Sequence, residues 1–291
     1  MYLKIERGLS ESSIESYTLD VLGFEKFLID ENITKNPIDC DLSSVQTFIY
    51  ETAKLLSPNT QARRLSGLRS FFDYMIFESY RVSNPTDLIE APKLGRKLPD
   101  VLDLNEVDLL LEQIDLGHPQ GFRNRAMLEM LYGSGIRVSE LVNLSLSNLF
   151  FQENLIRVTG KGNKQRLVPM GKFTKKFILF YINNSRTQQN IDSVYQDIVF
   201  LNRNGKILTR QMIFTIIKQL ALKADIKKKI GPHTFRHSFA THLLENGADI
   251  RTIQILMGHE NITTTEVYTH LDTQHLRSVI ERFHPRDGSK R

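Results

Sequence analysis

The sequence predicts a mainly α-helical protein with a small β-sheet, organised as two domains. Before about residue 90, apolar residues recur at helical spacing, as they do from Ile14 to Leu28. Residues 92–99 contain two prolines and a glycine, which cannot continue a helix, and three basic residues that favour water. Two short strand-like segments then flank the glycines of 160–164. We therefore expect an all-helical domain at 1–91, a linker at 92–99 and an α+β domain at 100–291.

The residue patterns predict three helices in the N-terminal domain, and start signals mark the first and the third. The first begins near residue 10, where Ser12 and Glu15 have the spacing of a capping box. The second is expected from about Ser43 to Leu55. The third begins at Ser57-Pro58, because serine is a favoured N-cap and proline suits the first helical position.

The third helix carries three arginines, Arg63, Arg64 and Arg69. We interpret them as facing the phosphates or a groove of a nucleic acid, although three solvated arginines on an exposed face would give the same pattern. Charge along the chain is uneven: residues 1–95 hold 10 Lys/Arg and 14 Asp/Glu, and the rest of the chain holds 28 and 19. The basic surplus of the C-terminal two-thirds is by itself a weak indication of nucleic-acid binding.

The second domain is expected to begin with helices and to continue with a β-hairpin. Leu102, Asp103 and Glu106 form a staple and a cap that start a helix. The hairpin connection has glycines where positive φ angles can be needed. The expected elements are helices at 103–114 and 123–132, strands at 155–159 and 166–169, a lesser strand at 199–201, and helices after Thr209 with Gly247 and Gly258 at C-caps.

Cysteine content and hydrophobicity exclude several classes of protein and of metal site. Cys40 is the single cysteine, so the chain can form neither an intrachain disulfide nor a zinc site of several thiolates. The sequence has no signal-peptide stretch and no apolar run of roughly 20 residues that could span a membrane. It also has no Gly-x-x-x-x-Gly-Lys-Ser/Thr loop and no metal-binding motif. We expect a soluble cytoplasmic protein that needs no metal, nucleotide or other cofactor.

Five short segments of the second domain supply residues for phosphate chemistry. They are Gly135–Glu140, Gly160–Lys164, His233–His237, Leu256–His259 and Val267–His270. Two arginines and a lysine among them can hold a phosphodiester and neutralise charge that builds on it. Tyr268 can attack phosphorus and store the bond covalently. Each of these signals alone is weak, because lysines at the tips of hairpins and tyrosines at the rim of a core are common. Together they point to breaking and rejoining DNA without metal or ATP.

In these motifs the chain resembles the tyrosine recombinase (phage-integrase-like) family, most closely the Xer-type site-specific recombinases of bacteria. The matching text is Gly135-Ile-Arg137-Val-Ser-Glu140-Leu, Gly160-Lys-Gly-Asn-Lys164-Gln-Arg166, His233-Thr-Phe-Arg236-His237-Ser-Phe-Ala-Thr-His242, Ile255-Leu-Met-Gly-His259 and Thr265-Glu-Val-Tyr268-Thr-His. The resemblance covers nearly the whole chain. It implies a SAM-like core-binding domain and a catalytic domain that form a C-shaped clamp on DNA, and strand cleavage through a 3′-phosphotyrosine intermediate.

The resemblance also implies a role for each matching residue. Tyr268 is the nucleophile, Arg137 and Arg236 clamp the non-bridging oxygens, and Lys161 protonates the leaving 5′ oxygen. The other expected site residues are His233 as acid/base, His259 as a phosphate ligand, Glu140 as a supporting residue, and Arg63, Arg64, Arg69, Lys164 and Arg166 as DNA-binding residues.

The implied partners are a double-stranded DNA recombination site and further subunits, in a homo- or hetero-tetramer on two sites. A sister Xer recombinase and the cell-division DNA translocase are further candidates. An apolar set at helical spacing is expected as a C-terminal exchange helix at about 271–283 that docks on a neighbour. Its members are Leu271, Leu276, Val279, Ile280 and Phe283. The alternative is that this helix folds back onto its own domain.

The expected function is resolution of chromosome dimers at a terminus site. The first helix begins near residue 10, which leaves no room for the extra N-terminal domain that mobile-element integrases often carry, although a short integrase stays an alternative. A type IB topoisomerase shares the chemistry but does not account for the segment after Tyr268. A non-catalytic DNA-binding relative would have no need to keep all seven site residues.

Overall fold

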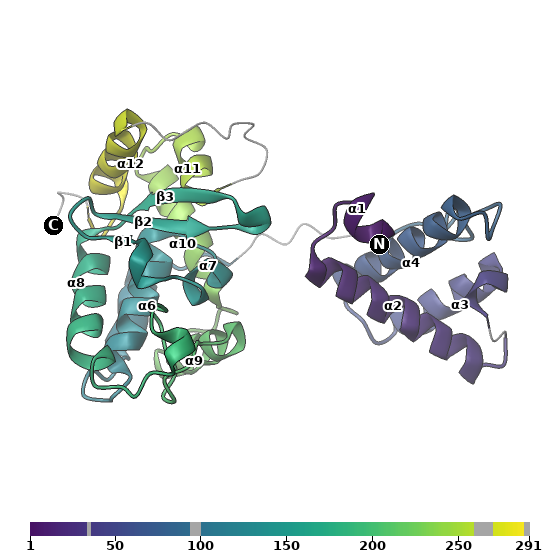
Figure 1. The fold of residues 1–291 in the computed structure, drawn as a ribbon, viewed down its shortest axis with the longest axis horizontal. Coiled ribbons are helices and arrows are strands. Elements are labelled where there is room, and N and C mark those ends of the chain that lie inside the picture. The colour runs from purple at the N-terminus through teal and green to yellow at the C-terminus, as the bar shows by residue number, and fades with distance from the viewer. Residues whose placement is uncertain (34–35, 94–99, 259–269, 288–291) are drawn as a thin grey trace. The chain divides into compact units, whose positions relative to one another are not determined.

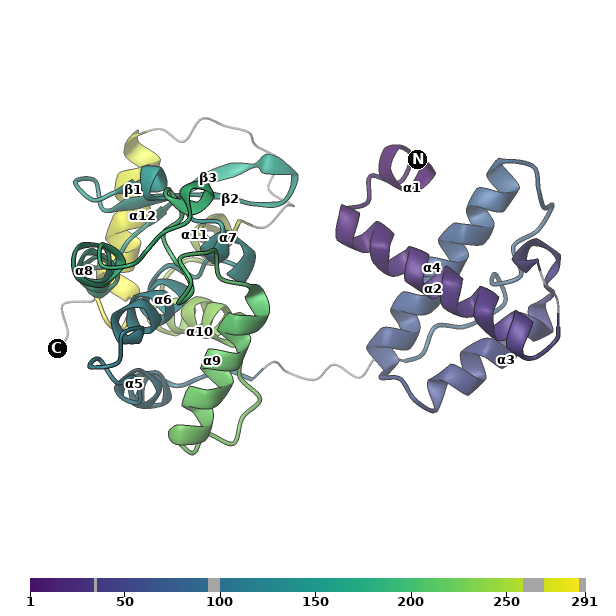
Figure 2. The ribbon, with the colours of Figure 1, turned by 60° about the horizontal axis from the view of Figure 1, so that its bottom comes forward.

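The computed structural model describes residues 1–33, 36–93, 100–258 and 270–287. The chain forms two compact units, Met1–Lys97 and Leu98–Arg291 (Figure 1, Figure 2). Each unit has its own apolar core. Helices predominate in both units, and the second also contains a three-stranded sheet. The predicted fold class is confirmed. No helix in the described part of the chain is both long and apolar enough to cross a bilayer.

The first unit is a set of helices around a small aromatic core. Its elements are α1 (Tyr2–Ile5), α2 (Glu11–Asp30), a 3-10 turn (Pro37–Asp39), α3 (Leu42–Ala53) and α4 (Pro58–Phe77). The ring centroid of Phe24 lies 5.1 Å from that of Phe48 and 6.2 Å from that of Phe72. Burial of such rings dominates the energetics of a small core. Cys40 lies in the same core, and burial raises the pKa of its thiol to about 11.

Serine caps begin α2 and α4. Ser57 accepts a hydrogen bond from the Thr60 amide at 3.3 Å, and Pro58 occupies the first turn, as predicted. The cap of α2 is Ser10 rather than Ser12. Ser10 has the extended backbone that a cap requires and accepts from an amide of the first turn, whereas Ser12 already lies inside the helix.

The three arginines of α4 are engaged by protein acceptors. Asp20 is 2 % exposed, and its carboxylate accepts both Nη groups of Arg63, one of them at 3.0 Å. The Nε of Arg64 lies 3.5 Å from the same carboxylate. Arg69 donates to the carbonyl oxygen of Ile89. A buried carboxylate needs such partners, and Arg63 is both paired with Asp20 and exposed to solvent. Contact of these residues with DNA stays a prediction.

The second unit packs its helices around the buried helix α6. Its helices are α5 (Leu104–Glu112), α6 (Gly121–Ser134), α7 (Val138–Val142), α8 (Lys172–Phe180), α9 (Arg210–Lys223), α10 (Pro232–Glu245), α11 (Ile250–Met257) and α12 (His270–Phe283). Single turns of 3-10 or π helix lie at Leu146–Asn148, Lys161–Asn163, Tyr181–Arg186 and Ser193–Tyr195. Every residue of α6 from Ala126 to Ser134 is buried, which is typical of a helix surrounded by others.

The sheet of the second unit is antiparallel, with its strands in chain order. The strands are β1 (Leu149–Phe150), β2 (Leu155–Thr159) and β3 (Gln165–Pro169). Ile156 pairs with Leu149 on one side and with Val168 on the other. β2 and β3 form the predicted hairpin, and Gly162 in its connection has a φ of +68°. The hairpin prediction is therefore confirmed.

Two further predictions about local structure have different outcomes. Asp103 and Glu106 form the predicted capping box at the start of α5, with hydrogen bonds of 2.8 and 2.9 Å. The lesser strand predicted at 199–201 is wrong, because its residues and their neighbours make isolated bridges instead of a ladder. These residues are buried in the core, and a short buried apolar run does not reveal its secondary structure by periodicity.

Helix α12 packs on its own unit. Leu276, Val279 and Ile280 are 3, 4 and 2 % exposed, and the helix contacts β3, α10 and α11. In the single chain the helix therefore packs on its own domain, and its docking on a neighbouring subunit stays a prediction. Burial of each aliphatic side chain stabilises the folded protein by about 1.5–3 kcal/mol. A single chain gains this free energy by packing the helix on its own domain.

A short segment after α12, His284–Asp287, fastens this helix to the unit, and we call it the C-terminal clasp. Arg286 pairs with Asp108 of α5 and with Glu129 of α6, the latter at 2.9 Å. The Asp287 carboxylate accepts from the first amide of α8 at 2.7 Å. It thereby caps a helix whose own N-cap residue is a glycine. The clasp connects α5, α6 and α8 to α12.

Candidate active site

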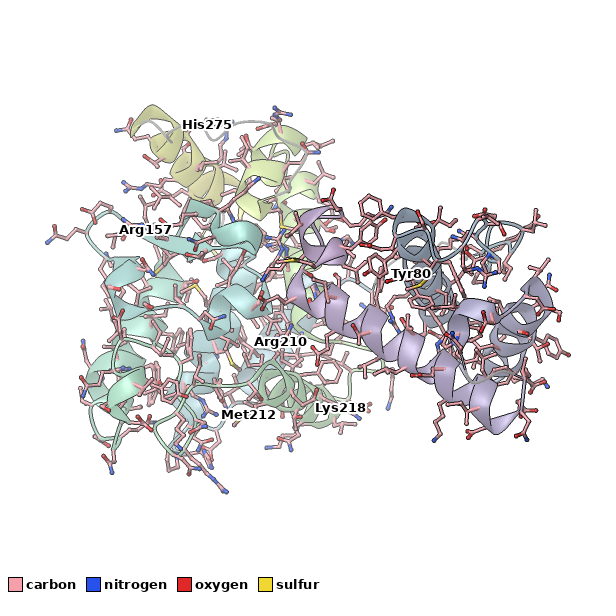
Figure 3. The ribbon with its side chains drawn as sticks, turned by 45° about the vertical axis from the view of Figure 1, so that its right-hand side comes forward. Tyr80, Arg157, Arg210, Met212, Lys218 and His275 are labelled. Carbon is pink, nitrogen blue, oxygen red and sulfur yellow. The ribbon has the colours of Figure 1, made fainter. Side chains whose placement is uncertain are left out.

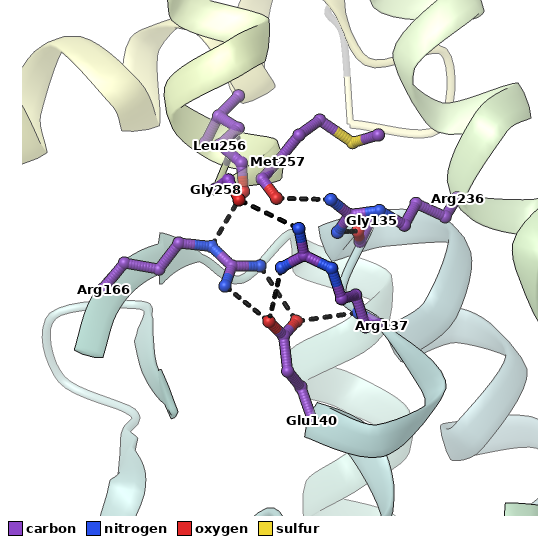
Figure 4. A network of polar contacts seen from close by, with 8 residues as sticks. All are labelled: Gly135, Arg137, Glu140, Arg166, Arg236, Leu256, Met257 and Gly258. Carbon is purple, nitrogen blue, oxygen red and sulfur yellow. Dashed lines mark hydrogen bonds and ion pairs between the residues drawn. The ribbon is translucent and has the colours of Figure 1, made fainter. Parts of the chain in front are cut away.

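Three arginines from three different elements converge on the carboxyl end of α11 (Figure 4). Each guanidinium donates to one backbone carbonyl there: Arg166 to Leu256 at 3.1 Å, Arg236 to Met257, and Arg137 to Gly258 at 2.9 Å. Carbonyls at a helix end have no partner within the helix and readily accept basic side chains. The fold thus brings together Arg137 and Arg236, which the sequence analysis took from separate motifs.

A sharp turn after α6 places Arg137. Gly135 ends α6 with a φ of +58°, and a side chain there would meet the ring of Phe239 at 2.3 Å. Glycine is therefore required by both conformation and space. Arg137 follows as the N-cap of α7, where its amide and its Nη1 donate to Glu140 at 2.8 and 3.0 Å. Its side chain is 36 % exposed, so a ligand can reach the guanidinium from solvent.

Arg236 is the buried member of the predicted pair. It lies on α10, is 7 % exposed and donates to the carbonyls of Gly135 and Met257. Burial, together with the charges of Arg137 and Arg166, lowers its pKa to about 9. The guanidinium is still a cation at neutral pH. Burial of this charged group costs free energy, and a bound anion would reduce that cost.

The carboxylate of Glu140 lies between Arg137 and Arg166 and is 3 % exposed (Figure 4). Besides the two bonds from Arg137, it accepts Nη1 and Nη2 of Arg166 at 2.7 and 2.9 Å. Burial by itself would raise the pKa of Glu140. The hydrogen bonds and charge of Arg166, with the hydrogen bonds from Arg137, outweigh burial and hold this pKa below its ordinary value. Glu140 is therefore an ionised carboxylate, and it holds Arg137 in place by accepting its hydrogen bonds.

The burial of Arg166 does not favour its predicted contact with DNA. Arg166 is 7 % exposed, pairs with Val158 across the hairpin, and commits both Nη groups to Glu140. The buried face of β3 carries it inward, which its basic character alone did not indicate. Lys164, two residues earlier, is exposed, and its contact with DNA stays a prediction.

The hairpin connection runs along the edge of the arginine cluster. A Cβ on Gly160 would lie 3.4 Å from Glu140 Oε1 and 4.0 Å from Arg137 Nη1. The backbone therefore passes close to the Arg137–Glu140 pair at this point. Lys161 is the next residue and begins the turn Lys161–Asn163. The placement of its side chain lies outside the described part of the structure.

Three predicted site residues remain. One is a histidine that the structure describes, and the other two lie outside the described residues. His233 is exposed on the first turn of α10, three residues before Arg236. His259 and Tyr268 fall outside the described residues. In the sequence, His259 directly follows Gly258, whose carbonyl Arg137 holds. That both residues join the cluster stays a prediction.

The described cluster carries a surplus of positive charge. Three guanidiniums and one carboxylate give a net charge of +2. A phosphodiester attacked by an oxyanion develops two negative charges, and fixed positive groups in a partly buried site stabilise such a transition state. In the described ranges, no three His, Cys, Asp or Glu side chains are grouped so as to hold a metal ion. The net charge of +2 and the partly exposed Arg137 suit the binding of a phosphodiester through guanidiniums.

We expect Glu140→Gln to lower the free energy of unfolding at neutral pH by about 3–5 kcal/mol, because buried guanidiniums lose their counter-charge. The pKa of Glu140 is lowered in the folded state. Its stabilisation is therefore complete above the ordinary value of 4.5 and is lost as the pH falls through the folded-state pKa. Urea unfolding should show the difference between the two proteins shrinking in acid. Glu153→Gln, at an exposed glutamate, is the control. A difference that persists unchanged in acid would contradict the role of the carboxylate.

Comparison with known proteins gives consistent results over the whole chain. The model of the phage integrase family matches residues 100–275, and that of the phage integrase N-terminal SAM-like domain matches residues 1–79. The tyrosine recombinase XerD of Staphylococcus aureus is 42% identical over 98% of this chain and 96% of the relative. That of Staphylococcus saprophyticus is 43% identical over the same shares.

Two solved structures illustrate the structural likeness. The crystal structure of XerA recombinase has 30% identity and a TM-score of 0.52, and covers 98% of this chain and 95% of that one. XerH recombinase in a post-cleavage complex with palindromic difH has 22% identity and a TM-score of 0.73, and covers 95% and 81%. The latter supports the fold alone. The family models and the extent of identity to the XerD proteins show that this chain belongs to the tyrosine recombinases of the phage integrase family, and within them to the Xer type.

Proposed function

We propose that this recombinase cleaves and rejoins DNA at a specific site through a 3′-phosphotyrosine formed on Tyr268, and that it resolves chromosome dimers. The observation that carries the proposal is the cluster of Arg137, Glu140, Arg166 and Arg236 at the end of α11, with its net charge of +2. Such a cluster suits a phosphodiester in the course of attack. The likeness to XerD proteins over 98% of the chain supports the biological role.

In the proposed reaction, the Tyr268 oxygen attacks phosphorus and the bond from phosphorus to the 5′ oxygen breaks. Arg137 and Arg236 bind the two non-bridging oxygens and stabilise the added charge. Lys161 gives its proton to the leaving 5′ oxygen, so that a hydroxyl departs. His233 takes the phenolic proton, and His259 donates a hydrogen bond to the phosphate. Attack by a 5′ hydroxyl of a partner strand reverses these steps and releases Tyr268.

The covalent intermediate explains how the reaction can proceed without an added energy source. The phosphotyrosine keeps the free energy of the broken phosphodiester, so rejoining needs neither ATP nor a metal-activated water. We further propose that the first unit and the second both contact the DNA site. Strand exchange between two sites then takes a tetramer, of this chain alone or with a sister Xer recombinase, in the cytoplasm. Control by the cell-division DNA translocase is part of the same proposal.

The alternative of a mobile-element integrase has the same chemistry and a different target. We favour the chromosomal role because the curated relatives of 42–43% identity are XerD proteins. A non-catalytic relative would retain DNA binding without the cluster, and here Arg137, Glu140 and Arg236 are assembled.

Mapping covalent protein–DNA complexes across the host chromosome tests the proposal. We expect one dominant peak near the replication terminus, which disappears in cells that carry Tyr268→Phe. A peak at the ends of a mobile element would support the integrase alternative. Peaks that persist with the phenylalanine variant would contradict the proposed chemistry.

A further inference from the structure

We infer that Arg166 is a positioning residue, which fixes the guanidinium of Arg137 through Glu140 and joins it to the carboxyl end of α11. The inference rests on the proposed function, because its consequence is for strand cleavage. Both Nη groups of Arg166 bind the charged Glu140 carboxylate and its Nε binds the Leu256 carbonyl, whereas the described partners of the Arg236 Nη groups are neutral carbonyls. Arg166 therefore acts through Arg137 and Glu140 and not by touching the phosphate.

The hydrogen bonds of Glu140 show how the effect would be transmitted. A carboxylate offers about four acceptor positions, and Glu140 fills them with two donors from Arg137 and two from Arg166. Without Arg166, two of these positions become vacant. The Arg137 guanidinium can then turn onto both oxygens and leave the carbonyl of Gly258, which it holds at 2.9 Å. Arg137 is the partly exposed guanidinium of the cluster, so this movement withdraws it from an incoming phosphate.

Arg166 also links the hairpin to α11. Its Nε donates to the Leu256 carbonyl at 3.1 Å. Gly258 has a φ of +62°, and a Cβ there would lie 3.0 Å from that same Nε. The guanidinium therefore packs against the backbone that immediately precedes His259. Arg166 thus connects three segments: its own strand β3, whose hairpin carries Lys161, α7, whose N-cap is Arg137, and the end of α11 (Figure 4).

Lysine cannot replace arginine in this position. The planar fork of Arg166 binds both oxygens of Glu140 and keeps Nε free for a carbonyl, whereas an ammonium is a single point donor. Arg166→Lys therefore keeps the charge and removes the geometry. If Arg166 served through charge alone, this variant would behave like the wild type.

The test compares Arg166→Lys with Arg157→Lys, a matched control on the other strand of the hairpin. Arg157 is exposed (Figure 3), and its guanidinium lies over the ring of Phe150. The measurements are the rate of covalent complex formation at saturating DNA, the Kd as a function of salt, and the unfolding midpoint. We expect Arg166→Lys to cleave about 10²-fold more slowly, the usual effect of a 1 Å misplacement. Its Kd and salt slope should stay those of the wild type, and Arg157→Lys should cleave normally.

A DNA substrate with sulfur at the 5′ bridging position adds a second readout. It replaces the leaving group that Lys161 protonates, so it should not restore cleavage by Arg166→Lys if Arg137 is the misplaced group. Cleavage by Arg166→Lys at the wild-type rate would overturn the inference. So would a weaker Kd with a shallower salt slope and normal cleavage of bound DNA, because those results identify a phosphate contact.

A double-mutant cycle covers the case in which Arg166→Lys folds poorly. Glu140→Gln with Arg166→Met removes both partners of the buried pair together, which costs less than removing one. If Arg166 acts through Glu140, the double variant should cleave no more slowly than Glu140→Gln alone. Additive losses would overturn the inference. Failure of the wild-type protein to form any covalent complex would instead refute the proposed function, and the role of Arg166 with it.

Discussion

Replacing Tyr268 with phenylalanine should abolish the covalent protein–DNA complex and leave DNA binding unchanged. The substitution removes the oxygen that would form the bond to phosphorus, and with it the whole covalent route. The substitution leaves the three arginines of the cluster unchanged, so phosphate binding should persist. A nicked substrate that traps the intermediate, followed by denaturing electrophoresis, measures the adduct, and a gel-shift titration measures binding.

Tyr80→Phe is the matched control for this experiment. It makes the same chemical change at a tyrosine of the first unit that is 60% exposed (Figure 3), and it should form the adduct at the wild-type rate. An adduct trapped with Tyr268→Phe would assign the nucleophile to another residue. Loss of DNA binding together with the adduct would show that Tyr268 has a structural role instead.

Lys161→Ala should slow cleavage by roughly 10²–10⁴, the usual contribution of a positioned general acid. A 5′ bridging sulfur is a better leaving group and needs little protonation, so this substrate should restore the rate of Lys161→Ala. It should not restore Arg236→Ala, because the lost guanidinium stabilises charge on the non-bridging oxygens. Single-turnover rates on the two substrates give the comparison directly.

Lys164→Ala provides the control within the same hairpin. Lys164 is exposed and is proposed as a phosphate contact, so its loss should reduce the salt dependence of binding and leave the cleavage rate of bound DNA unchanged. Equal rescue of Lys161→Ala and Arg236→Ala by sulfur, or rescue of neither, would contradict the separate roles.

Local signals in the sequence predicted the parts of the fold that depend on neighbouring residues. The capping box of Asp103 and Glu106 and the start at Ser57 are examples, because cap and amide lie within one turn of the same helix. The four-residue α1 and the two-residue β1 were not predicted. Neither is long enough to show a period of helix or strand.

Tertiary contacts explain what the sequence could not predict about the site. Motifs identified Arg137 and Arg236, but the burial of Arg166 depends on which face of β3 meets α7. One signal was available: Arg166 and Val168 are two positions apart, so on a strand they share a face. The pairing of Asp20 with Arg63 across the first unit had no comparable signal, because 43 positions separate the two residues.

The C-terminal clasp has a consequence for the order in which the protein folds. Arg286 holds Asp108 across 178 positions, and Asp287 caps α8 across 115. These residues are synthesised after every helix they hold, and contacts of such sequence separation form slowly. The first unit can fold during translation, whereas the second can complete its core only after α12 and the clasp have been made. A nascent chain should therefore carry a finished helical domain beside an unfinished arginine cluster, and the capacity to cut DNA should arise only with the release of the late residues.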